Sequence, residues 1–296
     1  KNKVTFWNSR KSNYLEALET SNVKFTIKED DLIIESGNYE IVESVIFPKN
    51  VNLILEPGVN LTLSKKINLL VRGSLIAKGN KSQKITIKSN NPSDKNSSFG
   101  SLIVLGDSNK DNVILEYFTI SGGYHANFMG INTTSQIHLN NIKKIIINKS
   151  VFSNSYSDDG LNIKNSNISI FQSIFKDNFS DQLDIDHSKG QISFNEFFSN
   201  KKLNDNKNGD GLDVSSSILR ITENIFQFNS DKGLSIGENS ITKVSENQFN
   251  KNYIAIAIKD GSKATLKDNI FNENKKKIEV YRKKLFYNSP EKIIVN

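Results

Sequence analysis

The segment NIFQFNSDKGLSIGENSITKVSENQFNKN (224–252) carries one short motif twice, and this repetition decides the fold. Both copies have the form N-x-F-x-x-N, and Phe226 lies 23 residues before Phe249. A fixed period of this length is the sequence signature of a repeat architecture. The motif or its Phe recurs in four other segments: SVFSNS (150–155), SIFKDN (173–178), NEFFSN (195–200) and NIFNEN (269–274).

A second motif runs in phase with the first and alternates apolar residues with small or polar ones. Alternation with a period of two predicts strands with one buried face. Several short strands in each period, joined by turns rich in Asn, Asp, Ser and Gly, exclude helical repeats and predict a solenoid of stacked coils. The copies of this motif are DGLNI (159–163), DQLDI (181–185), DGLDV (210–214), KGLSI (232–236) and IAIAI (254–258).

Equivalent residues on successive coils are expected to form ladders, because paired strands lie about 4.8 Å apart. Phe would stack inside the solenoid, and Asn would line one turn, where its amide can bond both the backbone and the next Asn. The long step between Phe197 and Phe226 contains KKLNDNKN (201–208), which predicts a loop inserted into one coil. The predicted ladders are Phe118, Phe152, Phe175, Phe197, Phe226, Phe249 and Phe271, and Asn178, Asn200, Asn229, Asn252 and Asn274.

Composition narrows the classes of function. The chain has 296 residues, of which 36% are hydrophobic and 24% charged, and this balance indicates a globular protein. No run approaches eighteen apolar residues, which predicts no membrane span, and the absence of cysteine excludes disulfides and thiolate metal sites. The formal charge of +7 permits an anionic partner such as an acidic glycan, whereas lysines dispersed among 32 acidic residues argue against nucleic acid.

The coil length and the Phe and Asn ladders resemble the right-handed parallel β-helix of the pectate-lyase-like superfamily. The stretch IIESGNYEIVESVIFPKNVNLILEPGVNLTLSKKINLLVRGSLIAKGN (33–80) is similar to the opening coils of such proteins. The resemblance implies an all-β chain that forms a single right-handed parallel β-helix solenoid with caps at both ends. It implies an extracellular, cell-surface or periplasmic location as well. The expected divisions are an N-terminal cap (1–30), the parallel β-helix (31–285) and a C-terminal tail (286–296).

The outward residues of the second motif place acids on neighbouring coils, because side chains alternate across a strand. One predicted outward column runs through Asn132, Asn162, Asp184, Asp213, Ser235 and Ala257, and the next through Thr134, Lys164, Asp186, Ser215, Gly237 and Lys259. Asp159, Asp181, Asp210 and Lys232 precede the strands at one corner. The sequence therefore predicts an acidic patch over coils 158–213, which comprises Asp158, Asp159, Asp181, Asp184, Asp186, Asp210 and Asp213, with Lys164 and Lys232 at its edges.

Such a patch requires compensation. Two carboxylates about 5 Å apart repel by roughly 3 kcal/mol at an effective dielectric constant of 20, so Asp184 and Asp213 favour a cation, a shared proton or a lysine. The chemistry is that of a Ca²⁺ site or of an acid/base pair for glycoside cleavage. The resemblance to pectate lyases implies that Ca²⁺ is bound by Asp184, Asp186, Asp210 and Asp213 and that Lys164 or Lys232 is the catalytic base. Solvated turn residues are the alternative interpretation of the same acids.

Other candidates lie around the patch. His187 follows Asp186, and the tripeptide IDH (185–187) echoes part of a motif of one pectate lyase family. The loop SGGYHANFMG (121–130) is expected to bring Tyr124 and His125 over the acidic face, as catalytic candidates on a rigid scaffold. Charged residues downstream are expected either to bind a charged sugar chain, together with Asp158 and Asp159, or to form solvated salt bridges. They are Glu238, Lys259 and Arg282.

Two functional hypotheses follow. The first is an enzyme that acts on an acidic polysaccharide, a lyase or an epimerase, and uses the aspartate patch with Ca²⁺ and a Lys, His or Tyr base. The second is a non-catalytic module, either glycan-binding or surface-structural, of a larger protein. The abrupt start at KNKVTFWNSR (1–10) favours a domain excised from a longer chain, and the clustering of acids on neighbouring coils favours the enzyme.

Overall fold

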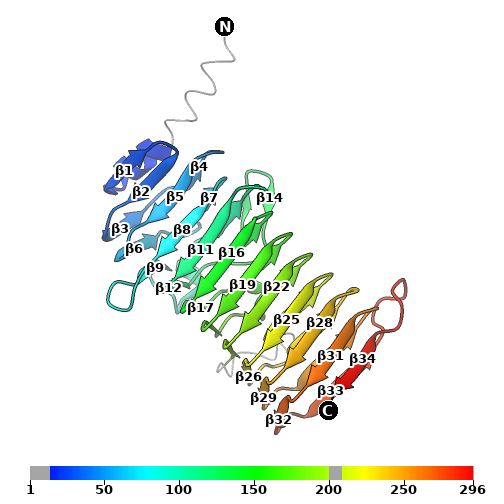
Figure 1. Cartoon of the computed structure of the whole chain (residues 1–296). Helices are drawn as coiled ribbons and strands as arrows, with labels where there is room; N and C mark the ends of the chain where they lie inside the picture. The colour runs from blue at the N-terminus through cyan, green and yellow to red at the C-terminus, as the bar shows by residue number, and fades with distance from the viewer. Residues whose placement is uncertain (1–13, 200–208, 296) are drawn as a thin grey trace.

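The computed structural model describes residues 14–199 and 209–295, so the loop predicted at 201–208 and Asn200 lie outside the described residues. The chain winds into a solenoid whose strands fall into three long sheets, and the coils follow one another along a single axis (Figure 1). Apart from the ends and one hairpin, every strand pairs in parallel with the equivalent strand of the next coil. The predicted all-β solenoid of stacked coils is confirmed.

The first sheet has twelve strands and faces the viewer in Figure 1. In spatial order it contains β1 (Phe25–Lys28), β2 (Asp31–Ile34), β5 (Asn52–Leu55), β8 (Leu75–Lys78), β11 (Asn112–Glu116), β16 (Lys144–Asn148), β19 (Asn167–Phe171), β22 (Lys189–Ser193), β25 (Ile218–Thr222), β28 (Ile241–Ser245), β31 (Lys263–Lys267) and β34 (Glu291–Val295).

The second sheet has ten strands and carries the second sequence motif. It contains β4 (Val45–Phe47), β7 (Leu69–Val71), β10 (Leu102–Leu105), β15 (Ile137–Asn140), β18 (Asp159–Lys164), β21 (Asp181–Asp186), β24 (Leu212–Ser215), β27 (Lys232–Gly237), β30 (Ile254–Lys259) and β33 (Lys276–Tyr281).

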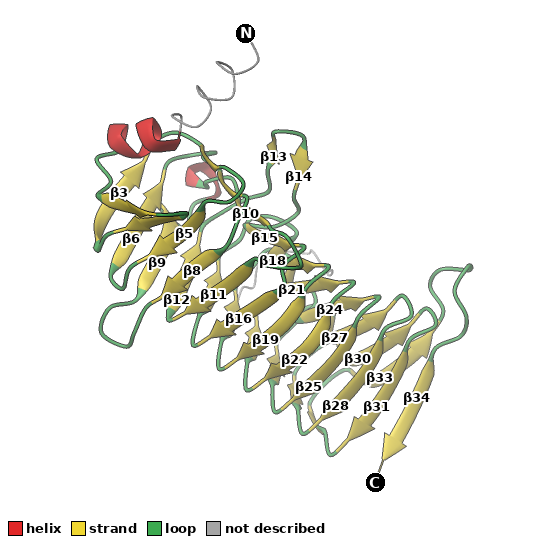
Figure 2. Cartoon of the chain, turned by 45° about the horizontal axis from the view of Figure 1, so that its top comes forward, coloured by secondary structure: helices red, strands yellow, loops and turns green. Residues whose placement is uncertain are grey.

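The third sheet carries the Phe of the first motif. It contains β3 (Gly37–Ile41), β6 (Val59–Leu63), β9 (Ile85–Ser89), β12 (Phe118–Ser121), β17 (Val151–Ser153), β20 (Ile174–Lys176), β23 (Glu196–Phe198), β26 (Ile225–Gln227), β29 (Gln248–Asn250) and β32 (Ile270–Asn272). A short 3-10 helix, η1 (Lys95–Ser97), and an antiparallel hairpin of β13 (Asn127–Phe128) and β14 (Ile131–Asn132) project from the coils (Figure 2).

Ladders of like residues fill the interior, as predicted. The rings from Phe152 to Phe249 stack nearly parallel, with centroids 4.8–5.0 Å apart, and the ladder continues to Phe271 at 5.5 Å. The Asn ladder is present where it is described: the Asn229 amide donates to Asn252 Oδ1 at 2.8 Å, and Asn252 donates to Asn274 at 2.9 Å. Each repeat therefore buries the same side chains against the next.

The two ends of the solenoid differ: the first coil is covered, whereas the last strand, β34, is exposed along its length. At the N-terminal end, helical residues 14–20 and the antiparallel pair β1–β2 cover the first coil, and Tyr14 packs against Phe47 with ring centroids 6.0 Å apart. At the other end, the segment expected to be a tail (286–296) contributes β34, which pairs in parallel with β31. The first sheet thus extends beyond residue 285.

Candidate functional site

The second sheet presents the predicted acidic face. Leu161, Leu183 and Leu212 are register partners and fully buried in the core, so the residues between the inward positions point outward. The outward columns are as predicted from β18 to β27: Asn162, Asp184, Asp213 and Ser235 in one, and Lys164, Asp186, Ser215 and Gly237 in the other. Asp184 and Asp213 therefore lie on adjacent strands of one face.

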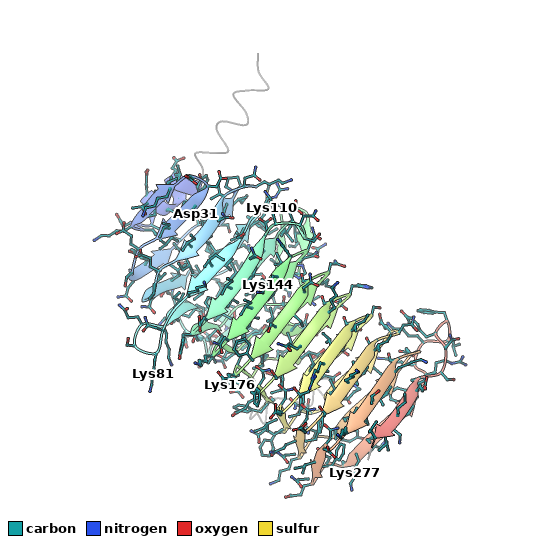
Figure 3. The ribbon with its side chains drawn as sticks, viewed as in Figure 1. Asp31, Lys81, Lys110, Lys144, Lys176 and Lys277 are labelled. Carbon is teal, nitrogen blue, oxygen red and sulfur yellow. The ribbon has the colours of Figure 1, made fainter. Side chains whose placement is uncertain are left out.

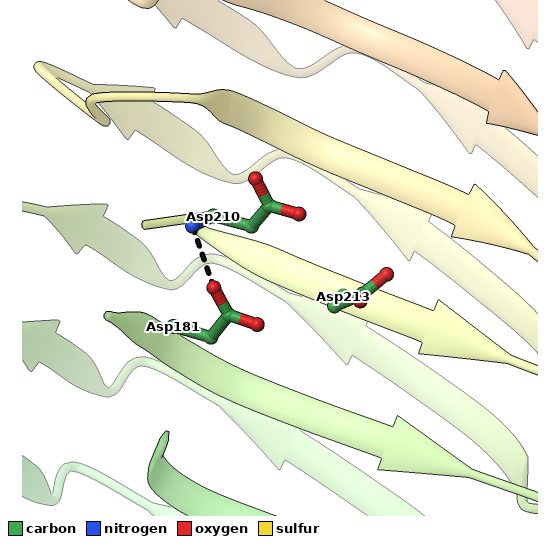
Figure 4. A group of neighbouring side chains, drawn as sticks. All are labelled: Asp181, Asp210 and Asp213. Carbon is green, nitrogen blue, oxygen red and sulfur yellow. Dashed lines mark hydrogen bonds between the residues drawn. The ribbon is translucent and has the colours of Figure 1, made fainter. Parts of the chain in front are cut away.

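Three aspartates converge where the strands begin (Figure 4). Asp181, Asp210 and Asp213 each place a carboxylate oxygen within 4.8 Å of the others. The Asp210 amide donates to Asp181 Oδ1 at 2.8 Å, and this bond fixes the corner between coils. Asp181 belongs to the predicted acidic patch, but it is not among the metal ligands that the resemblance implies. The sequence signal for Asp181 is its position in the repeat, because it occupies the same corner as Asp159 and Asp210.

Burial is the main cause of the raised pKa values of the aspartates in this patch. Desolvation, together with repulsion from Asp213, raises the pKa of Asp210 to about 7 against the attraction of Lys232. Desolvation also raises the pKa of Asp159 to about 7, although Thr134 donates to its carboxylate at 2.5 Å. The pKa of Asp181 lies well above its ordinary value because of burial and the nearby Asp210. Asp159 and Asp210 are therefore protonated in part at neutral pH.

Lysines from the following coils partly neutralise the acids. Lys232 Nζ lies 3.3 Å from Asp210 Oδ1 and also binds Asp231, while Lys259 Nζ lies 3.9 Å from Asp213. Both lysines are buried, so their charges act in a poorly hydrated environment. The predicted proximity of Lys232 and Lys259 to the patch is thereby observed.

A hydrogen-bonded chain crosses three strands, β15, β18 and β21, beside the aspartate cluster. His138 Nδ1 lies 2.8 Å from Asn162 Oδ1, and the Asn162 amide donates to Asp184 Oδ2 at 2.6 Å. The same amide lies 3.5 Å from Asp186, whose carboxylate pairs with Lys164 at 2.8 Å. Because Asn162 donates toward the carboxylates, its oxygen must accept, so His138 carries its proton on Nδ1. Nε2 is then the lone-pair nitrogen of the ring.

The pKa values of the two basic groups at the ends of this hydrogen-bonded chain, His138 and Lys164, are shifted in opposite directions. Desolvation lowers the pKa of His138, so the imidazole is neutral and able to accept a proton. Asp186 and its neighbours outweigh desolvation at Lys164 and raise its pKa. The pKa of Lys232 is raised as well, by Asp210 and Asp231 against desolvation. Both lysines are therefore held as ammonium ions, which is the wrong protonation state for a base.

The position of His138 shows that the predicted outward column is wrong on the coil before β18. The predicted column placed Asn132 beside Asn162, whereas the register partner of Asn162 is His138. The reason is local: residues 127–132 form the antiparallel hairpin β13–β14, so the strand of this coil begins later, at β15. The alternation of inward Ile137 and Leu139 around His138 is the sequence signal that could have found it.

Several candidates lie away from the acidic cluster. His187 is exposed at the turn after β21, with a left-handed φ of 47°, and Asp158 is exposed beside the buried Asp159. Glu238 forms an ion pair with Lys284, and Arg282 is exposed after β33. Tyr124 and His125 line a different cavity, on the N-terminal side of the patch.

The oxygen geometry can accommodate a hard divalent cation. Ca²⁺ binds oxygens at about 2.3–2.6 Å, so oxygens up to about 5 Å apart can share one ion. Asp181, Asp210 and Asp213 satisfy this limit, with Lys232 as a competitor for Asp210. The ligand set expected from the resemblance is therefore divided: Asp210 and Asp213 join Asp181, while Asp184 and Asp186 are engaged by Asn162 and Lys164.

Comparison with known families assigns the chain. The family model described as a right handed beta helix region matches residues 135–289, which is more than half of the chain. The protein therefore belongs to this family of right-handed parallel β-helices. The fold predicted from the resemblance to the pectate-lyase-like superfamily is confirmed.

Several solved structures are similar to the chain at low identity. Tailspike protein 2 of the Escherichia coli O157:H7 bacteriophage CAB120 is 10% identical with a TM-score of 0.49, and the match covers 89% of this chain and 37% of that one. ORF18 of Geobacillus virus E2 is 10% identical with a TM-score of 0.47, and coverage is 84% and 52%. The chain thus spans about half or less of these two proteins.

A third similar structure is matched over nearly its whole length. The A-module of the mannuronan C-5 epimerase AlgE4 of Azotobacter vinelandii is 12% identical with a TM-score of 0.37, and the match covers 96% of this chain and 94% of that one. No curated protein matches the sequence. Among the described residues, no helix has the length and apolar character needed to cross a membrane.

Proposed function

We propose that the protein acts on an acidic polysaccharide, as a lyase or an epimerase, at the outward face of β15, β18, β21 and β24. Both reactions begin when a base removes the proton from the carbon next to the uronate carboxylate. In a lyase the C–H electron pair forms a C=C bond and the neighbouring glycosidic C–O bond breaks. In an epimerase the proton returns to the opposite face of the same carbon.

The buried aspartates carry this proposal. A uronate proton becomes acidic enough to remove only when the charge of the adjacent carboxylate is neutralised. Asp159 and Asp210, with pKa values of about 7, are protonated in part at neutral pH and can donate a hydrogen bond to that carboxylate. A Ca²⁺ ion held by Asp181, Asp210 and Asp213 would supply the same neutralisation. Protonated aspartates and a bound Ca²⁺ ion would therefore serve the same purpose, which is to neutralise the uronate carboxylate.

The most suitable base is His138. Its pKa is lowered by burial, its Nδ1 proton is held by Asn162, and Nε2 keeps a lone pair. Lys164 and Lys232, which the resemblance suggested as bases, are stabilised as ammonium ions by Asp186, Asp210 and Asp231. Their charges are better suited to binding the polymer. A polymeric substrate of this kind places the protein outside the cell, at the cell surface or in the periplasm.

The test is incubation with a panel of uronic acid polymers in Ca²⁺ and in chelator, at pH 6 to 9. Unsaturated ends are detected by ultraviolet absorbance, and C5 inversion by sugar analysis of the recovered polymer. We expect one of the two products, and a loss of 10²-fold or more in rate for His138→Gln with little change in KM. Ser169→Ala, on the first sheet, is the matched control. Wild-type protein without either product on the whole panel would reject the enzyme.

The ion pairs support a second function, that of a non-catalytic glycan-binding or surface-structural module. Lys164–Asp186, Lys232–Asp210 and Lys259–Asp213 compensate much of the acidic charge within the chain, as a structural network would. The same polymer panel distinguishes the two. Binding of a polymer without chemical change, unaffected by His138→Gln, would establish the module.

A further inference from the structure

A separate cavity lies on the N-terminal coils, outside the acidic face. It has a volume of about 560 Å³, which is within the range of small-molecule sites. Its wall is built by the turn before β7, by η1 with the residues that follow it, and by the segment that leads into β13. Phe99, fully buried in the core, is among its lining residues.

The cavity is positively charged. Lys65, Lys66 and Lys95 line it, and none of the described residues that line it is acidic. The three lysines form no ion pair with any residue from 14–199 or 209–295. Asp94, the neighbour of Lys95, is occupied in capping η1, where it accepts from the Asn96 amide at 2.8 Å. Within the described part of the chain, these three ammonium groups therefore have no ion-pair partner.

Aromatic rings position one of these ammonium groups. Lys95 Nζ lies 5.3 Å from the centroid of the Tyr124 ring, a cation–π contact, and the Tyr124 ring packs on His125 at 4.0 Å. The Tyr124 amide donates to the Gly100 carbonyl at 2.8 Å, which ties this segment to the coil beneath it. The cation is thus held before any ligand arrives.

Close packing makes the base of the cavity rigid. A Cβ on Gly100 would lie 2.0 Å from Asn68 Oδ1, so only glycine allows the two turns to approach. Asn68 Oδ1 in turn accepts from the Ser101 amide at 2.9 Å in a buried position. Tyr124 and His125, expected over the acidic face, instead complete this cationic wall. A rigid wall presents its charges to a ligand at little entropic cost.

We propose that this cavity binds an anionic sugar unit, whose carboxylate or sulfate is held by Lys66 and Lys95 and whose hydroxyls meet Asn68, Asn96 and Asn127. The volume, the lysine charges and the amide side chains among the lining residues together favour a charged oligosaccharide over a lone ion. The cavity lies at the turns that lead into β7 and β10, two strands of the sheet that carries the acidic face. In that sheet β10 is two strands from β18 and three from β21, or about 10–15 Å. One anionic polymer can therefore occupy the cavity and extend to the acidic face. Binding at the cavity does not require that the acidic face be catalytic.

Calorimetric titration of the full chain with three tetramers tests the proposal: galacturonic acid, neutral galactose, and galactose bearing one sulfate per unit. We expect saturable binding of at least one anionic tetramer, weakened by salt, and binding of the neutral tetramer at least about tenfold weaker. Comparison of the galacturonic acid and sulfated galactose tetramers identifies whether carboxylate or sulfate is preferred. Equal affinity for the neutral tetramer, or no binding of any tetramer, would overturn the proposal.

Matched variants locate the site. Lys66→Gln/Lys95→Gln should weaken binding of the anionic tetramer by about tenfold or more. The control is Lys144→Gln/Lys243→Gln, which removes the same charge from the first sheet, where Figure 3 shows Lys144. Equal loss in both double variants would place binding elsewhere. The titration reports on the cavity and the polymer panel on the acidic face, so that failure of the proposed reaction and failure of this site are told apart.

Discussion

The interior and the acidic face of the same coils share one strand register, but the register has opposite effects on stability in the two places. Inside, the strand register places Phe197 between Phe175 and Phe226, with centroids 5.0 and 4.9 Å away, and each added ring gains contact. Outside, the same register places Asp184 beside Asp213, and each added carboxylate adds repulsion. Stacking like on like stabilises the core and destabilises the patch. An arrangement that costs stability therefore points to function.

The largest expected effect comes from breaking the interior ladder. Phe197→Ala removes a fully buried ring from the middle of the stack and should cost about 3–5 kcal/mol of unfolding free energy. Denaturant unfolding followed by circular dichroism measures it. Phe194→Ala is the matched control, because Phe194 lies in the same coil and is 54% exposed, and its cost should stay within about 0.5 kcal/mol. Similar losses in both variants would contradict a ladder that carries the stability.

The interior was accessible to prediction from the sequence because its signal is local and repeated. Phe226 and Phe249 show the period, and the alternation around Leu234 shows which face is inward, so the register from β18 to β30 follows without coordinates. The residue that continues the outward column, His138, was missed, because the hairpin β13–β14 interrupts the phase just before it; only the local alternation of Ile137 and Leu139 marks its strand.

The properties of the outward face were harder to predict. Outward residues of a solenoid are expected to be solvated, yet Asn162 and Ser235 are fully buried, and this burial sets the pKa values of the acids around them. The cationic cavity gave no periodic signal, because Lys65, Lys66 and Lys95 lie outside the long strands. Which turns meet in space depends on the length of each connection, and the sequence does not reveal it.

A second prediction uses the pH dependence of the acidic face. Asp159 has a folded pKa of about 7 against an ordinary value of 3.8, so the folded state binds more protons than the unfolded state between these values. Its contribution is complete below about pH 4 and is lost as the pH rises through 7. We expect unfolding free energy to fall by roughly 2–4 kcal/mol from pH 5 to pH 8.

The variant Asp159→Asn should reduce this dependence, since its amide carries no charge at any pH, whereas Asp210, whose pKa is also about 7, retains its own contribution. Thermal and denaturant midpoints between pH 4.5 and 8.5 provide the measurement, and Asp268→Asn, on an exposed turn, is the control that should leave the slope unchanged. His138 acts in the opposite sense: its lowered pKa reduces stability as the pH falls below its ordinary value. A slope identical in wild type and Asp159→Asn would mean that this carboxyl is charged in the folded protein.

The smallest expected effect tests whether a metal ion or a lysine balances the charge of the three aspartates. At pH 8 the carboxyl of Asp210, with a pKa of about 7, is mostly ionised, and millimolar Ca²⁺ bound only by the folded state at Asp181, Asp210 and Asp213 should raise the unfolding free energy by about 1–2 kcal/mol. At pH 5 a proton occupies Asp210 and competes with the ion, so the gain should disappear. Asp213→Asn removes one of the three ligands without touching the Lys232–Asp210 pair, and it should abolish the gain at pH 8. A gain that survives in Asp213→Asn places the ion elsewhere, and no gain in wild type leaves Lys232 as the charge that makes this face tolerable.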